Sequence, residues 1–234
     1  MHGTFAVAGS LLLCFGVGCA PNPLPPGEGP ASPVTTVSLS MASPPPAPAA
    51  APRATATEST PPADASALED AAHAVLKALQ SKDMDRLASL VHPELGLRFS
   101  PYAFVELDKD VVLTRAQLKG ALRDSKPRRW GSFDGSGEPM VLSFARYFDT
   151  FVWSHDFTVA PDISVDRTIQ VGNTISNLQA AYPGARFVEL HFRGFDPKYT
   201  GMDWESLRLV FRPSPSGDAA RWLLVGVIHD GWTI

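Results

Sequence analysis

Cysteine is nearly absent from this chain. Its two cysteines, Cys14 and Cys19, both lie among the first twenty residues. The sequence beyond them therefore excludes disulfides, thiolate metal sites and catalytic thiols. Any folded part must be held together by its core alone, and the roughly 170 residues after position 63 are enough to form one.

An excess of charge of one sign is also lacking. From Asp64 onward the chain has 22 acidic and 19 basic residues, so this part is close to neutral. General nucleic-acid binders and proteins that bind anionic membranes carry strong positive fields. The charge balance therefore argues against both, and we expect no nucleic-acid partner.

The N-terminus has no Lys, Arg, Asp or Glu and is mostly apolar over residues 4–20. This run is short of the ~20 apolar residues that span a bilayer and is typical of the apolar region of a signal peptide. Residues 16–20, Gly-Val-Gly-Cys-Ala, resemble the bacterial lipobox, in which small residues precede a cysteine that receives lipid. The lipobox favours Leu three residues before the cysteine, where this chain has Gly16.

The lipobox resemblance implies that residues 1–19 are a signal segment and that Cys19 is lipidated. The protein would then be extracytoplasmic and membrane-anchored, in the cell envelope or periplasm. Two alternatives remain: simple cleavage after Ala20, which Pro21 disfavours, and an uncleaved anchor.

Proline dominates the next segment, since 13 of the 22 prolines lie within residues 21–62. Its only charged residues are Glu28, Arg53 and Glu58. This segment also has few large apolar side chains, and their burial cannot offset the entropy lost when the chain is ordered. We therefore expect residues 20–63 to be a disordered tether and residues 64–234 to form one domain. The tether is either a spacer that lifts the domain from a membrane or a leader with no length requirement.

Helical periodicity marks the first half of the domain. Ser66 and Glu69 fit a capping box, and the apolar residues after them recur at helical spacing. Asp83 is suited to cap a second helix, which His92-Pro93 would end. Residues 96–100 are typical of a strand. Two further helices are expected over residues 114–122 and 142–152, the second packing through Phe144, Tyr147, Phe148 and Phe151.

The last third of the chain changes to the pattern of strands. Residues 163–170, 186–193, 205–212 and 221–229 alternate between apolar and polar or run apolar. The turn-forming residues 213–218 predict that the last two strands form an antiparallel hairpin. We expect an α+β fold, in which N-terminal helices pack on a curved antiparallel sheet.

The helix pair, the HPELGLRF segment and the closing sheet resemble the nuclear transport factor 2-like (cystatin-like cone) fold. More narrowly, HPELGLRFSPY, WGSFDGSGEP, FDPKYTGMDWESLRLVF and LVGVIHDGWTI resemble segments of uncharacterised bacterial exported proteins. These resemblances imply export and a cone-like fold. They imply no activity, because proteins with cone folds differ widely in function.

The candidate catalytic residues are Glu189 and His191. Alternation along residues 187–193 places them on one face of a strand, about 7 Å apart, with Val188, Leu190 and Phe192 on the other face. In cone folds the concave face of the sheet lines a pocket, where such residues would form an acid–base pair. The alternative is a solvated face on which the charges satisfy each other.

The candidate binding residues lie near the ends of the last strands. His229, Asp230 and Trp232 follow one another at the C-terminus, and an aromatic loop over residues 195–204 contains Tyr199 and Trp204. Arg208, on the strand after that loop, is grouped with them. We expect no cofactor and no metal, because no HExxH or similar helical spacing is present. A metal set drawn from His92, His155, His191 and His229 is the alternative.

These features predict a membrane-tethered, extracytoplasmic lipoprotein that binds a ligand or has an accessory role in the envelope. Its partners would be the membrane, through its lipid, and a small molecule or envelope component. One alternative is an enzyme with isomerase-like or dehydratase-like acid–base chemistry, which requires Glu189 or His191 in a deep cavity. Another is a structural module that forms homodimers, which requires an exposed apolar sheet face. A binding module requires an aromatic-lined groove near Trp204 and Trp232.

Overall fold

The structure is a computed structural model, and it describes residues 63–216 and 221–232. The signal segment, Cys19 and nearly all of the tether lie outside the described residues. Within the described residues, no helix is both long and apolar enough to cross a membrane.

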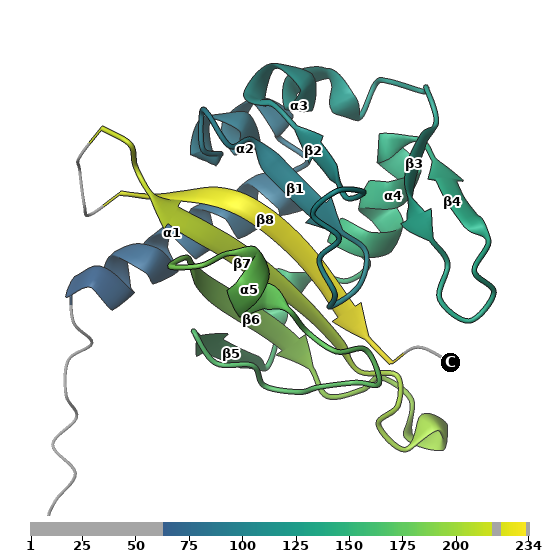
Figure 1. The fold of residues 1–234 in the computed structure, drawn as a ribbon. Coiled ribbons are helices and arrows are strands. Elements are labelled where there is room, and N and C mark those ends of the chain that lie inside the picture. Colours follow the sequence, from purple (N-terminus) through teal and green to yellow (C-terminus); the bar gives the residue numbers. More distant parts are fainter. Residues whose placement is uncertain (1–62, 217–220, 233–234) are drawn as a thin grey trace, which may run out of the picture. The chain divides into compact units, whose positions relative to one another are not determined.

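A six-stranded sheet forms the centre of the fold, in the order β2-β1-β8-β7-β6-β5 (Figure 1). Its strands are β1 (Leu97–Ser100), β2 (Val111–Leu113), β5 (Asp162–Val165), β6 (Arg186–Phe192), β7 (Glu205–Pro213) and β8 (Trp222–Gly231). The neighbours from β5 to β8 are antiparallel, and β7 and β8 form the predicted hairpin. The expected α+β class is confirmed.

The sheet is mixed, which corrects the expectation of a wholly antiparallel one. Strand β1 runs parallel to β8, and the residue pairs extend from Arg98 with Gly226 to Ser100 with Ile228. The short strand β2 then pairs antiparallel with β1 at the sheet edge. No local sequence pattern indicates this pairing, because β1 and β8 are more than a hundred residues apart and no local turn connects them.

The helical segments begin with α1 (Ala63–Gln80), α2 (Met84–Leu90) and α3 (Arg115–Ala121). Helix α1 starts three residues before Ser66, so the expected capping box lies inside the helix. Asp83 caps α2 as predicted, accepting a hydrogen bond of 2.9 Å from the backbone N–H of Arg86. Thr114 and Gln117 form a capping box at the start of α3.

The expected helix over residues 142–152 is two shorter segments. Leu142 ends strand β4 (Pro139–Leu142), which pairs with β3 (Arg128–Ser132) in a separate hairpin. Helix α4 (Phe144–Tyr147) follows and continues as a π-helical turn, η1 (Phe148–Val152). The four aromatic residues predicted to pack are all buried, and the ring of Tyr147 stacks on Trp130 at 3.9 Å. The remaining helical segments are η2 (Phe157–Val159), α5 (Leu178–Ala181) and η3 (Pro197–Tyr199).

Each face of the central sheet carries a buried apolar core. On one face, Val188, Leu190, Leu207 and Leu209 join the main core with residues of α1, α2 and α4. On the other face, Phe187, Val210, Val225 and Ile228 form a smaller core with Val105 and with Leu178 and Tyr182 from the α5 region. Figure 1 shows α1 behind the sheet and α5 in front of it.

Candidate functional site

Strand alternation divides the predicted site residues between the two faces of the sheet. Val188 and Leu190 point into the main core, as expected, so Glu189 and His191 face the α5 side. His229 and Asp230 are neighbours in sequence and point to opposite faces. Asp230 pairs with Arg208, and His229 pairs with Glu205. The sheet therefore builds two separate polar clusters.

The first cluster, the buried polar chain, consists of His191, Ser206, Glu189, Arg208 and Asp230. His191 Nδ1 lies 2.9 Å from Ser206 Oγ, whose hydroxyl donates to Glu189 Oε1 at 2.8 Å. The guanidinium of Arg208 donates from Nε to Glu189 Oε2 at 3.0 Å, and its Nη2 lies 2.7 Å from Asp230 Oδ2. All five residues are at most 3% exposed. Each charged group of the buried polar chain is thus desolvated and paired with a group of opposite charge.

A backbone segment closes the buried polar chain from the α5 side. The Ile169 N–H donates to Glu189 Oε2 at 3.2 Å, and Arg208 Nη2 donates to the Gln170 carbonyl at 3.3 Å. The ring of Trp204 lies 5.7 Å from that of His191. Burial lowers the pKa of His191, which favours the neutral imidazole. The Ser206 hydroxyl donates to the carboxylate, so the neutral His191 donates from Nδ1 to Ser206.

The acid–base role of Glu189 and His191 stays a prediction. In the described conformation Ser206 links the two side chains and Arg208 pairs with Glu189, so the charges are satisfied as in the alternative expectation, but on a buried face instead of a solvated one. Residues 169–170 and Trp204 lie against this part of the sheet, and neither Glu189 nor His191 is open to a substrate in this conformation.

The second cluster, the Glu205 cluster, places one carboxylate between two imidazoles. Glu205 Oε1 lies 2.7 Å from His229 Nε2 and accepts a hydrogen bond from Ser154. Glu205 Oε2 lies 2.5 Å from His155 Nδ1, an ion-pair distance without the in-plane alignment of a hydrogen bond. Burial alone would raise the pKa of Glu205, but His229, the Ser154 hydrogen bond and His155 together outweigh it and lower that pKa overall.

Sequence reasoning missed Glu205 and left His155 only in a candidate metal set. Nothing around Glu205 marks it, because it is the first residue of a strand and its partners come from segments far away in sequence. His155 is 40% exposed at its side chain, and Phe195 stacks on its ring at 4.0 Å. The adjacent Asp156 instead caps η2 through the N–H of Thr158. In the part of the chain that the structure describes, no group of three or more His, Cys, Asp or Glu residues is arranged to hold a metal ion.

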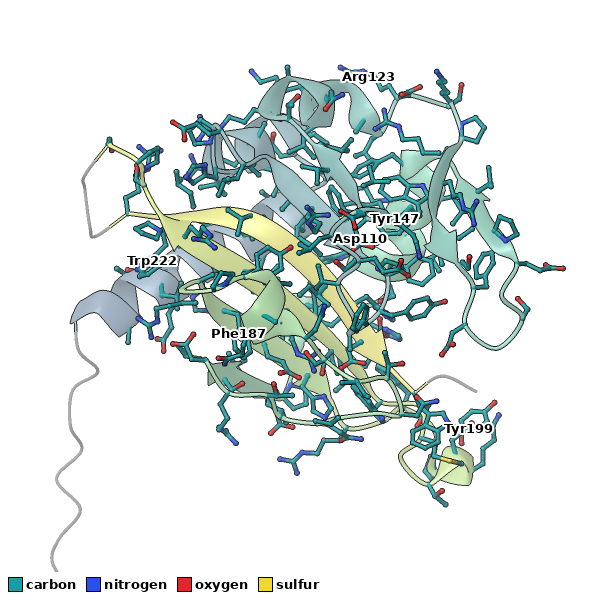
Figure 2. All side chains as sticks on the ribbon, in the orientation of Figure 1. Asp110, Arg123, Tyr147, Phe187, Tyr199 and Trp222 are labelled. Carbon is teal, nitrogen blue, oxygen red and sulfur yellow. The ribbon has the colours of Figure 1, made fainter. Side chains whose placement is uncertain are left out.

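The aromatic residues predicted to line a groove differ in exposure. Trp204 is 3% exposed and packs so closely on Gly172 that a Cβ there would lie 3.0 Å from its ring. Tyr199 and Trp232 are each 47% exposed. Figure 2 shows Tyr199 on the loop that projects beyond the end of the sheet. Little of Trp204 is therefore open to a ligand, and binding near Trp204 and Trp232 stays a prediction.

A different groove, of about 490 Å³, lies between α1 and the edge strand β5. We call it the α1–β5 groove. Its apolar lining comes from α1 on one wall and from β5 and β6 on the floor and the other wall: Ala72, Leu76, Ile163, Val165, Val188 and Leu190. Most of these side chains are also part of the core, but Ile163 is 51% exposed.

The mouth of the α1–β5 groove is polar. Glu69 and His73 lie on the α1 wall, one helical turn apart, and Arg167 lies just beyond the end of β5. The nearby arginines are neutralised, Arg186 by Asp166 and Arg193 by Asp162, each at 2.6 Å. Arg167 has no ion pair within residues 63–216 and 221–232. The groove thus combines an apolar interior with a few charged groups at its opening.

Comparison with models of known protein families, with curated proteins and with solved structures finds no match to this chain. The α1–β5 groove and the two polar clusters are therefore the basis for inferring function.

Proposed function

We propose that this protein is a lipoprotein tethered to a membrane outside the cytoplasm, and that its domain binds a ligand in the α1–β5 groove. The groove itself carries the proposal. Its volume of about 490 Å³ lies within the range of ligand sites in proteins, which is roughly 300–1,000 Å³. Such sites are mostly apolar with a few polar groups that fix orientation, and this groove has that composition.

The polar clusters support binding less well than the groove does. The buried polar chain has all its members at most 3% exposed, so it favours a structural role over contact with a ligand. A dimerising module would need a large exposed apolar sheet face, whereas both faces of this sheet carry packed cores.

Ligand binding in the groove is tested by introducing a charge on its floor. We expect native mass spectrometry of the purified full chain to show an additional bound mass. Ile163→Asp should remove that mass, because a carboxylate cannot be desolvated against Val188 and Leu190. The matched control is Ile175→Asp, since Ile175 is 78% exposed and does not line the groove. A bound mass that survives Ile163→Asp would place the ligand elsewhere and contradict the proposal.

A further inference from the structure

We propose that the ligand of the α1–β5 groove is an extended peptide, which adds a strand to the free edge of β5 and places one acidic group at Arg167. This inference rests on the proposed function, because it assigns a partner to the same groove. It is narrower than the proposed function. If the groove binds a small molecule, the proposed function holds and the peptide inference fails.

The outer edge of β5 offers free backbone groups. Among residues 63–216 and 221–232, strand β5 is the last in the sheet and pairs only with β6. The N–H of Asp166 donates to the Phe187 carbonyl at 2.9 Å. This bond shows that every second residue of β5, counted back from Asp166, bonds to β6. Ser164 and Asp162 then exchange hydrogen bonds with β6, while the N–H and C=O groups of Ile163 and Val165 point away from it. These four outward groups can bond an added strand.

The groove lies directly beside this edge. Ile163 and Val165 project their side chains to the α1 side, because they pair with Leu190 and Val188 of the main core. An added strand would lie about 4.8 Å from β5, and every second side chain would point into the groove. Ala72 of α1 would then form the far wall. A groove between a helix and an edge strand is suited to peptide binding by strand addition, in which backbone bonds give affinity and side-chain pockets give specificity.

Charge complementarity defines one end of the peptide. Arg167 follows β5 by two residues, and within the described residues it is not neutralised, unlike Arg186 and Arg193. A guanidinium in this position can take a carboxylate, from an acidic side chain or from a C-terminus. Glu69 on the opposite wall offsets part of this positive charge. The geometry therefore favours a peptide with a single carboxylate at this end over a highly acidic one.

The test selects peptides and then asks whether they use the edge of β5. Random decapeptides displayed on phage, with free and with blocked C-termini, are selected on the immobilised full chain. The consensus peptide is synthesised with a fluorescent label, and its Kd is measured by fluorescence polarisation. We expect a consensus with alternating apolar residues and one carboxylate.

The decisive variant is Val165→Pro, which removes an outward N–H without breaking the ladder to β6. Proline is tolerated at such edge positions, and Ser164 before it is already extended. We expect Val165→Pro to raise the Kd about tenfold, while Val165→Ala, which keeps the N–H, changes it much less. Arg167→Gln should raise the Kd about fivefold, and Arg123→Gln, on the distant surface near α3, should leave it unchanged (Figure 2). Circular dichroism confirms that each variant is folded.

Three outcomes would overturn the peptide inference. The first is that no peptide is enriched, and the second is that the consensus peptide binds Val165→Pro as well as the wild type. The third is a wild-type dimer that Val165→Pro dissociates, which would make a second copy of the chain the occupant of the edge. If native mass spectrometry finds a small molecule that Ile163→Asp removes and no peptide is selected, the groove function stands and only the peptide inference fails.

Discussion

In this protein, the surroundings of each buried ionisable side chain decide whether its pKa is raised or lowered. Asp110 is 9% exposed, and its Oδ2 accepts hydrogen bonds from Ser100 Oγ at 2.5 Å and from the Glu106 N–H at 3.0 Å. These bonds favour the carboxylate, but burial outweighs them and raises the pKa of Asp110 to about 6. Glu205 shows the opposite balance, because His229 stabilises its charged form.

The raised pKa of Asp110 predicts a stability that falls as pH rises. The folded state holds the proton up to about pH 6, whereas the unfolded state loses it near the ordinary aspartate pKa of 3.8. The contribution of Asp110 is therefore fully present below about pH 4 and is lost as the pH rises through about 6. Asp110→Asn removes this dependence, because its amide oxygen can accept both hydrogen bonds and it does not titrate.

We expect Asp110→Asn to gain up to about 3 kcal/mol in free energy of unfolding between pH 4 and pH 7, relative to the wild type. Urea denaturation at a series of pH values measures this. Asp108→Asn, at an exposed neighbour, is the control. Parallel stability curves for the wild type and Asp110→Asn would show that Asp110 is not buried as a neutral acid.

Helices α2 and α3 begin where the sequence supplies a capping residue. Asp83 caps α2 and Thr114 caps α3, because each supplies an oxygen to a backbone N–H that the helix leaves free. The stretch around Phe148 departs from a regular helix, since α4 widens into a π-helical turn. That turn keeps Phe148, Phe151 and Val152 in the aromatic core. Local periodicity predicted which side would pack but not the change in helix type.

The cap of α2 gives a prediction at the scale of one element. Asp83→Ala removes the acceptor for the Arg86 N–H and should lower the free energy of unfolding by about 1 kcal/mol. Asp85→Ala is the matched control, because Asp85 lies in the same first turn and makes only an exposed contact of 3.8 Å with Lys119. Equal losses in the two variants, measured by denaturant unfolding, would mean that the cap contributes nothing specific.

The whole molecule, as we propose it, combines an anchor, a tether and a binding domain. The anchor is inferred from the residues around Cys19, and the tether from 13 prolines within residues 21–62. A tether of about 40 residues in polyproline II conformation would reach at most roughly 130 Å from a membrane. A groove for extended peptides would suit a protein that captures segments of envelope partners within that distance.

Lipid anchoring is tested by Cys19→Ala. We expect the wild type to fractionate with membranes and to incorporate labelled fatty acid, because acyl chains partition into the bilayer. Cys19→Ala should lose the label and change in size, since it would not be processed at the same site. Cys14→Ala is the control. A Cys19→Ala protein of unchanged size that is equally bound to membranes would contradict lipidation.

The sequence by itself determined the features that depend on neighbouring residues. Alternation placed Glu189 and His191 opposite Val188, and helical spacing located the stripe on α1, because both patterns repeat within a few residues. Only the tertiary structure decided what those faces meet. The parallel pairing of β1 with β8, the carboxylate of Glu205 between His155 and His229, and the groove between α1 and β5 all depend on contacts between distant segments. Such contacts follow from how the whole core packs, so no local pattern records them.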